Sequence, residues 1–349
     1  LGAIMIVDLG RSDAPWIHYF DYKEKYSMNP MVDFLRHEPW EHRVVSRLSP
    51  MGPYDISGDN NLAALCHFWL ENDFLYNDIE SLEIDQWPRM PEMDRDYLST
   101  FTVRSQDDLS PPVRMWRLTN TRYILADARV MPLLNQNAEP RNSFRPVMLM
   151  DIITKPNVTQ VENAGDLTIV TNDNGHIALM EFPQALPRAK LYANWQTLED
   201  KVALDKLNSP AFDPTKTVLV ASATPVAQGP AQPDKDPGTV TITSYKSKDV
   251  KLRANAKTAA VLLLNDHTGD YWNVWVDGKP GTVLRCNYIM RGVFVPAGQH
   301  TIEFRFQPPL NWLYVSISAF AIGILLTGYV IFISRKGEPV APTTLGNRP

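Results

Sequence analysis

One long apolar run near the C-terminal end dominates the hydrophobic pattern of the chain. Trp312–Ile333 holds 22 residues without a charged side chain. As a helix it would rise about 33 Å, enough to cross a bilayer core of about 30 Å, whereas a buried core helix is usually shorter and keeps a polar face. Trp312 and Tyr329 lie near the two ends, where aromatic side chains favour the membrane interfaces. The pattern predicts one C-terminal transmembrane helix over residues 310–334.

Basic residues beside this run set its expected orientation. Arg335 and Lys336 follow it directly, whereas Arg305 is the nearest cation on the other side. Because positive side chains favour the cytoplasmic side of a span, the sequence predicts a cytoplasmic tail over 335–349. Everything before Trp312 is then expected outside the cytoplasm.

A shorter apolar stretch, Leu1–Val7, opens the sequence and ends at Asp8. It is too short to span a membrane and lacks the basic region and cleavage site of a signal peptide. We interpret residues 1–9 as the end of a preceding transmembrane helix, so that the sequence is the tail of a longer protein. The alternative is a short buried strand of a soluble protein.

Helical and strand-like periods alternate between residues 10 and 210. Asn29-Pro30 has the residue types of a helix start, with an N-cap followed by proline at the first helical position. Helices are also expected at 60–71, 91–101 and 197–207. Strands are expected at 42–48, 113–118, 122–126, 146–153, 167–171, 176–182 and 189–194. Asp173–Gly175 has the composition of a hairpin turn. The pattern predicts an α+β domain over 10–210.

A period of two takes over after a strand at 217–221 and a proline-rich loop over 223–238. Apolar residues alternate with polar ones around 240–243, 250–255, 272–276 and 301–306. Ala259–Leu264 is a continuous apolar run that suits a central strand. Short alternating strands with regular turns predict an antiparallel β-sandwich domain over 211–309.

Composition narrows the classes of function. The 349 residues carry a net charge of −5, and because a nucleic-acid site needs a basic face, no nucleic acid partner is expected. No His or Cys cluster has metal-ligand spacing, so no metal site is expected. No P-loop or Rossmann fingerprint appears, and no cofactor is expected in this chain. Cys66 and Cys286 lie far apart, and both a disulfide and two free buried thiols remain open.

Residues 72–96 contain eight carboxylates. Paired carboxylates catalyse glycoside hydrolysis, and carboxylate oxygens also bind Ca²⁺. Sequence spacing sets neither geometry, and the spacing of an EF-hand is missing. We interpret the segment as a solvated acidic loop, with a glycosidase as a less favoured hypothesis, and assign it no catalytic residue.

The Tyr271–Pro309 segment reads YWNVWVDGKPGTVLRCNYIMRGVFVPAGQHTIEFRFQPP and leads directly into the apolar run. It contains, in order, Val-Asp-Gly-Lys-Pro, Arg-x-Asn and Gly-Val-x-Val-Pro-x-Gly-x-His. This order resembles the C-terminal end of the YfhO-type bacterial membrane proteins. Residues 118–125, 186–191 and 212–214 resemble further blocks of that family.

The resemblance implies a polytopic protein of the bacterial inner (cytoplasmic) membrane with a glycosyltransferase C-type bundle. Such a protein would use a polyprenyl-phosphate sugar donor and an acidic residue in an early outside loop. That loop would precede Leu1, so no catalytic residue is expected in this chain. The implied partners are the lipid bilayer, the missing N-terminal transmembrane bundle, and an envelope polysaccharide or lipid-linked sugar.

Several side chains of the Tyr271–Pro309 segment have the chemistry of a glycan contact, which combines an aromatic face with a few polar groups. They are Trp272, Trp275, Asp277, Arg285, Asn287 and His300. Each also has a structural interpretation. Asp277 and Gly278 suit a hairpin turn, Trp272 shares a face with Val274 and Val276, and His300 follows a turn.

The sequence leaves two main hypotheses about function. The first is the extracytoplasmic accessory portion of a membrane glycosyltransferase-like protein that modifies cell-envelope glycans or polymers. The second is a non-enzymatic, membrane-anchored β-sandwich module that binds envelope glycans or proteins.

Overall fold

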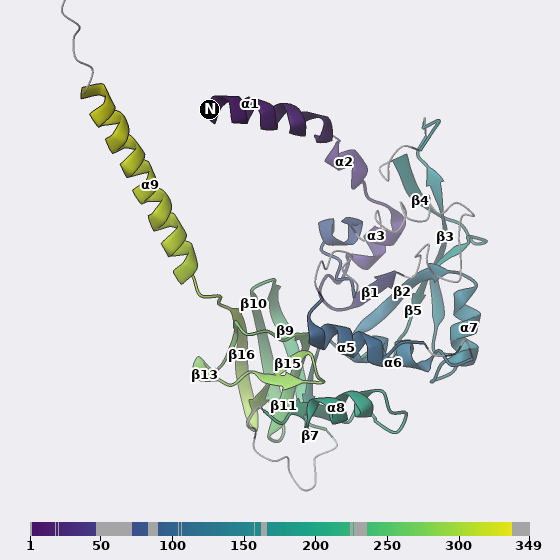
Figure 1. The fold of residues 1–349 in the computed structure, drawn as a ribbon. Coiled ribbons are helices and arrows are strands. Elements are labelled where there is room, and N and C mark those ends of the chain that lie inside the picture. Colours follow the sequence, from purple (N-terminus) through teal and green to yellow (C-terminus); the bar gives the residue numbers. More distant parts are fainter. Residues whose placement is uncertain are drawn as a thin grey trace, which may run out of the picture.

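The computed structural model describes residues 2–17, 19, 21–46, 72–82, 90–103, 105, 107–156, 158–161, 166–223, 226 and 236–336. The helix expected at 60–71, Cys66 and most of the expected tail lie outside these residues. The described residues form helices and strands in two mixed sheets and one antiparallel sheet, followed by one long C-terminal helix (Figure 1).

The first sheet has the strand order β1-β2-β5-β3-β4. Its strands are β1 (Arg43–Ser46), β2 (Thr121–Asp127), β3 (Arg145–Thr154), β4 (Leu167–Thr171) and β5 (Ile177–Glu181). The pair β1–β2 is parallel and the other pairs are antiparallel. The expected strands at 42–48, 122–126, 146–153, 167–171 and 176–182 are confirmed where described.

The hairpin expected at Asp173–Gly175 is wrong, although the chain does turn there. β3 lies between β4 and β5, so these two strands do not pair with each other. Asp151 of β3 holds the turn, because its carboxylate accepts hydrogen bonds from the His176 backbone N–H at 2.9 Å and from the Asn172 amide. The ten-residue β3 therefore provides the pairing edge for both neighbours.

Helices cover both faces of the first sheet (Figure 1). They are α3 (Pro30–Leu35) on one face, and α5 (Glu92–Thr100), α6 (Ser110–Leu118) and α7 (Val130–Asn137) on the other. The start of α3 is as expected, because the Asn29 side chain accepts a hydrogen bond from the Val32 N–H at 3.0 Å. The helix expected at 91–101 is confirmed as α5.

The strand expected at 113–118 is wrong, because these residues belong to α6. Pro111 lies in the first turn, where a missing N–H leaves no helical bond unmade. Ser110, Val113 and Trp116 are buried at intervals of three residues, which is a helical repeat. The apparent alternation of apolar residues with arginines in this short segment is therefore part of a helical face.

The second sheet has the order β6-β11-β15-β14-β8-β7. Its strands are β6 (Ala189–Tyr192), β7 (Asn194–Leu198), β8 (Thr217–Ala221), β11 (Ala260–His267), β14 (Leu284–Cys286) and β15 (Met290–Val295). α8 (Asp200–Leu207) connects β7 to β8, which pair in parallel, so the sheet is mixed rather than purely antiparallel. The helix expected at 197–207 is shorter, because residues up to Leu198 form β7.

The third sheet is antiparallel and has the order β13-β12-β16-β10-β9. Its strands are β9 (Gly238–Lys246), β10 (Asp249–Ala256), β12 (Trp272–Val276), β13 (Lys279–Gly281) and β16 (Gly298–Phe306). The Asp277-Gly278 turn joins β12 to β13, and both residues have the positive φ that such a tight turn requires. That expected hairpin turn is confirmed.

Three clusters of buried side chains hold the sheets together. One lies under α3 on the first sheet. A second runs from the other face of the first sheet through α5 and α6 to β8 and β11 of the second sheet. A third lies between the second and third sheets and includes Leu262, Val293 and Phe304. The first and second sheets therefore share a continuous core, and the six-stranded sheet takes strands from both sides of residue 210.

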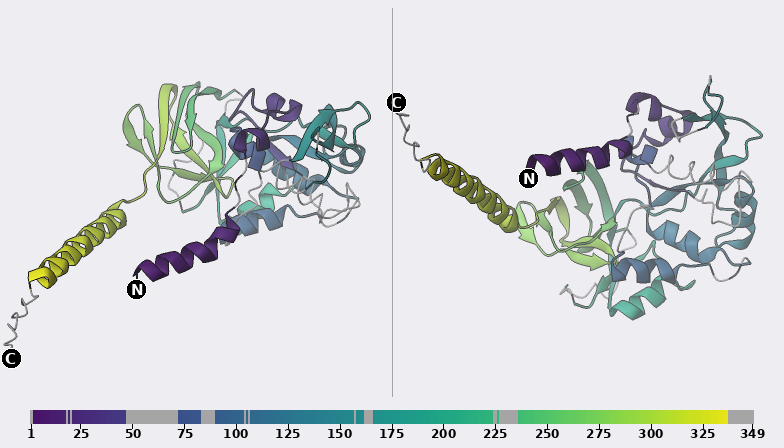
Figure 2. Two further views of the ribbon diagram at one scale, coloured as in Figure 1. Left: turned by 90° about the horizontal axis from the view of Figure 1, so that it is seen from above. Right: turned by 45° about the horizontal axis from the view of Figure 1, so that its top comes forward.

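The C-terminal helix α9 (Asn311–Lys336) matches the expected transmembrane run. Among the described residues it is the one helix long and apolar enough to cross a membrane, and none of its apolar stretch is buried against the rest of the chain. This is consistent with membrane anchoring. Figure 2 shows α9 extending away from the sheets.

The first residues also form an exposed helix. They are α1 (Gly2–Asp13), followed by η1 (Ala14–Trp16) and α2 (Tyr22–Lys25). Met5, Ile6 and Val7 are each at least 60% exposed, so the alternative of a short buried strand is wrong. In both views of Figure 2 the free ends of α1 and α9 lie on the same side of the folded body.

A buried carboxylate beside α3 predicts an unusual dependence of stability on pH. Asp73 is fully buried, and burial raises its pKa to about 6 although Asn29 and Asn77 donate hydrogen bonds to it. The folded state therefore holds a proton that the unfolded chain releases near pH 4. Stability should fall as the pH rises from about 4 to 6. We expect Asp73→Asn to raise the free energy of unfolding by about 1–2 kcal/mol at pH 7 and to flatten this slope.

Urea unfolding of the full chain in detergent micelles between pH 4 and pH 7 measures this effect. Asp151→Asn is the matched control, because the His176 N–H and Asn172 lower the pKa of Asp151. That carboxylate stabilises the fold above its unfolded pKa, so its replacement should weaken the fold at pH 7. Equal effects of the two substitutions would contradict the assignment.

Candidate functional site

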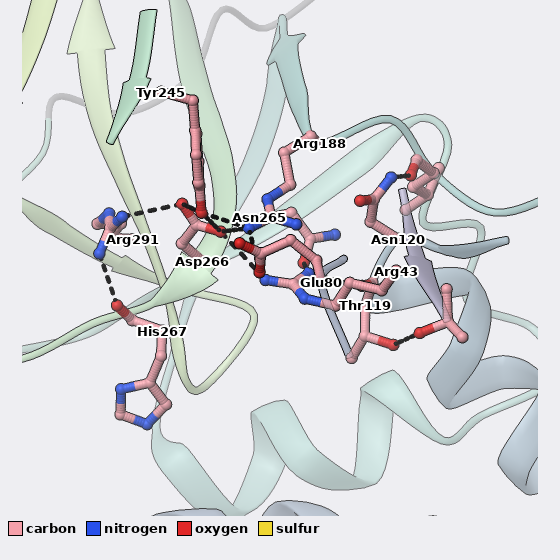
Figure 3. Close-up of polar contacts among 12 residues, drawn as sticks. Arg43, Glu80, Thr119, Asn120, Arg188, Tyr245, Asn265, Asp266, His267 and Arg291 are labelled. Carbon is pink, nitrogen blue, oxygen red and sulfur yellow. Dashed lines mark hydrogen bonds and ion pairs between the residues drawn. The ribbon is translucent and has the colours of Figure 1, made fainter. Parts of the chain in front are cut away.

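A pocket of about 510 Å³ lies where the three sheets meet. Its charged lining residues come from segments far apart in the sequence and are Arg43, Glu80, Arg188, Asp266 and Arg291. Tyr245, Trp272 and Phe306 add aromatic faces, and Ser247 lies at the turn between β9 and β10. We call this site the junction pocket. Figure 3 shows its polar contacts.

Asp266 is the centre of the junction pocket. Its Oδ1 forms an ion pair with Arg188 Nη2 at 2.7 Å and accepts a hydrogen bond from Arg43 Nη2 at 3.1 Å, and its Oδ2 accepts one from Arg291 Nη2 at 2.9 Å. The Tyr245 hydroxyl lies 3.2 Å from Oδ2. One buried carboxylate thus joins side chains from all three sheets (Figure 3).

An irregularity in β11 places this carboxylate. The apolar residues up to Leu264 pair regularly with β15, but the register shifts before His267. Asn265 and Asp266 lie in the shifted segment and are both buried. The Asn265 Oδ1 accepts a hydrogen bond from Arg43 Nη1, and its amide donates to the Leu118 carbonyl. Such bulges commonly redirect side chains beside a site.

The charges of the pocket do not balance. Three guanidinium groups face the carboxylates of Asp266 and Glu80, which leaves one net positive charge. Burial by itself would raise the pKa of Asp266, but Arg188, Arg43 and Arg291 hold it below the usual range. Burial and the neighbouring Arg188 lower the pKa of Arg43 to about 10, so it stays charged at neutral pH.

Aromatic rings lie against the guanidinium groups. The Arg291 guanidinium lies 3.6 Å from the centre of the Trp272 ring, and that of Arg188 lies 4.9 Å from the Tyr245 ring. Trp40 stacks with Tyr245, with 6.3 Å between ring centres. Cation–π contacts of this kind hold planar cations in a fixed orientation.

The six sequence candidates do not converge on one site. Trp272 is the one that lines the junction pocket. Trp275 lies beneath the Arg305 guanidinium at 4.9 Å, outside the pocket lining. Asp277 and His300 form a pair at 2.7 Å and line a separate pocket of about 510 Å³ at the β12–β13 turn.

Arg285 and Asn287 have structural partners in the second sheet. Arg285 pairs with Asp200 of α8 at 2.6 Å and donates to the Tyr288 carbonyl. Asn287 is buried, and its side chain accepts a hydrogen bond from the Leu219 N–H at 3.1 Å. These contacts connect β14 to α8 and β8.

Three described carboxylates of the 72–96 segment also have side-chain partners. Asp73 bonds to Asn29 and Asn77, Glu80 pairs with Arg188 at 3.2 Å, and Asp94 pairs with His267 at 2.9 Å. Residues 83–89 lie outside the described part of the chain. Cys286 is a buried free thiol, and burial raises its pKa to about 12.

The hydrophobic pattern does not single out the residues at the centre of the junction pocket. Asp266 lies two residues after the end of a buried apolar run, and Arg291 lies within the strand Met290–Val295. A charge inside a buried strand needs a partner of opposite sign, so the sequence around both positions indicates a buried ion pair. The partners of these charges were not identifiable, because they lie in distant segments.

Comparison of the chain with protein-family models, curated proteins and solved structures found no match in any of the three. The fold and site thus define a protein with two mixed sheets and one antiparallel sheet, a charged pocket at their junction, and a C-terminal helix able to span a membrane.

Proposed function

We propose that this chain is a membrane-anchored module that binds an envelope glycan in the junction pocket. The observation that supports this most strongly is the composition of the pocket. It combines the rings of Trp272, Tyr245 and Phe306 with the charged groups around Asp266. Small-molecule sites typically have aromatic walls and a few fixed polar groups.

In this proposal the module is the extracytoplasmic accessory portion of a YfhO-type, glycosyltransferase-like protein of the bacterial inner membrane. The Tyr271–Pro309 segment contains its motifs in the order typical of that family and leads directly into α9, which supports this assignment. The module would position a polymer acceptor, while a catalytic bundle elsewhere in the protein uses a polyprenyl-phosphate sugar. Arg335 and Lys336 at the end of α9 support an outside location for the sheets.

A stand-alone binding module is the second candidate. The carboxylates and arginines of the junction pocket already bind one another, which suits binding better than proton transfer. The coding sequence upstream of Leu1 separates the two candidates. Many apolar spans and an acidic residue in an early outside loop would support the transferase, whereas a single anchor would leave the binding module.

We also propose that the second and third sheets are the two layers of the expected β-sandwich. The shared cluster of side chains from β10, β11, β15 and β16 supports this arrangement. The sandwich would include β8, and also β6 and β7, which precede residue 211, the expected start of that domain.

Glycan binding is testable with the full chain in detergent micelles. We expect isothermal titration with hexose, hexosamine and uronate oligosaccharides to show saturable binding of at least one class. Trp272→Ala should weaken that binding at least tenfold, because central aromatic anchors dominate binding energy. Trp275→Ala is the matched control and should leave the affinity unchanged. Absence of binding, or equal effects of the two substitutions, would refute the proposal.

A further inference from the structure

The junction pocket lies close to the start of the membrane helix. Phe306 lines the pocket, and α9 begins five residues later at Asn311. Five extended residues span at most about 18 Å. The Phe306 N–H donates to the Lys248 carbonyl at 2.9 Å, and the Gln307 N–H donates to the Tyr271 carbonyl at 2.8 Å. Three segments therefore meet at the point where the chain continues into α9. They are the turn between β9 and β10, the loop before β12 and the end of β16.

This edge of the third sheet carries further positive charge. Lys246 and Lys248 are exposed on either side of Ser247, which lines the pocket. Asp270 in the loop before β12 is exposed and offsets one of these charges. With the net positive charge inside the pocket, the edge attracts anions at the surface of a bilayer that α9 crosses.

The arginines have more donors than the surrounding residues accept. In the described part of the chain, Arg188 Nε and Nη1 and Arg291 Nε are buried without a hydrogen-bond partner. The Arg188 side chain is only 3% exposed. Guanidinium groups present planar pairs of donors that match the oxygens of a phosphate, and a phosphate is small beside the pocket volume of about 510 Å³.

We propose that the junction pocket binds a phosphate group at the membrane surface, held by Arg188 and Arg291, which have the unpartnered donors. Asp266 and the face of Trp272 position these guanidinium groups, and Lys246 and Lys248 attract the anion to the rim. The proposal rests on the proposed function, because it narrows the ligand of the same pocket to one that bears a phosphate. The phosphate is either that of an anionic lipid headgroup or free in solution.

Titration of inorganic phosphate into the full chain in detergent micelles tests the shared chemistry. We expect saturable binding at constant ionic strength, with chloride as the control anion. Arg291→Lys keeps the charge but loses the planar fork, so phosphate affinity should fall at least fivefold. Arg253→Lys is the matched control on the exposed face of β10 and should have no effect.

A second variant covers the case in which Arg291→Lys fails to fold. Lys246→Gln combined with Lys248→Gln alters only exposed side chains, and it should weaken binding of an anionic lipid about fivefold. Native mass spectrometry after exposure to phosphatidylglycerol or phosphatidylcholine measures lipid retention.

The two arms identify the source of the phosphate. Retention of phosphatidylglycerol that inorganic phosphate displaces assigns the site to a lipid headgroup. Phosphate binding without lipid retention assigns it to a soluble phosphate. Absence of saturable binding in both arms overturns the inference, and oligosaccharide binding that persists in that case leaves the proposed function standing.

Discussion

Replacement of Asp266 by asparagine should lower the free energy of unfolding by about 3–5 kcal/mol, the largest effect expected for a polar residue in the described part of the chain. The substitution leaves Arg43, Arg188 and Arg291 buried around a neutral amide that can accept far less of their charge. Urea unfolding of the full chain in detergent micelles, followed by tryptophan fluorescence, measures the loss.

Asp249→Asn is the matched control for this prediction. Asp249 pairs with Arg305 at 3.7 Å, and both side chains are partly exposed, so the expected loss is about 1 kcal/mol or less. The pKa of Asp266 lies below its usual range, so its contribution is complete above about pH 4 and is lost only as the pH falls further. Similar losses for both variants would show that Asp266 does not organise the junction.

The second large effect is expected in the apolar core between the second and third sheets. Phe304 of β16 is fully buried there, and Phe304→Ala should lower the free energy of unfolding by about 3–5 kcal/mol. Tyr271→Ala, at an exposed ring beside the same sheet, should cost about 1 kcal/mol or less.

Urea midpoints of the two aromatic variants test whether the facing sheets are one cooperative unit. If they are, the Phe304→Ala protein should unfold in a single transition at lower urea. A separate early transition for the third sheet, with the rest of the chain unchanged, would argue against the β-sandwich proposed above.

Local elements were predictable wherever a residue type has one main structural use. Asn29-Pro30 begins α3, the uncharged run forms α9, and the strand at 217–221 has the predicted bounds. α6 was mistaken for a strand, because six residues are too few to separate a helical repeat from an alternation. Ser110 and Pro111 mark the start of the helix, and both precede the strand expected at 113–118.

The junction pocket was much less predictable than these elements. Trp272 was identified as a candidate, but Arg43 and Asp266 are separated by 223 positions in the sequence. Hydrophobic periods show which face of a strand is buried, and they contain no information about which distant strands meet. The pairing of three arginines with one aspartate depends on the meeting of three sheets, which no local pattern encodes.

The position of β16 in the third sheet has a consequence for the synthesis of this protein. β16 lies at the centre of the sheet, between β12 and β10, yet among the described strands it is the last to be synthesised. Until it emerges, the β9–β10 and β12–β13 pairs are separate and keep unpaired edges that can bind the wrong strand. α9 follows β16 almost at once, so in the membrane-anchored protein proposed above the sheet is completed just before the helix enters the bilayer. Delayed membrane insertion would then act first on the folding of the sheet next to the helix.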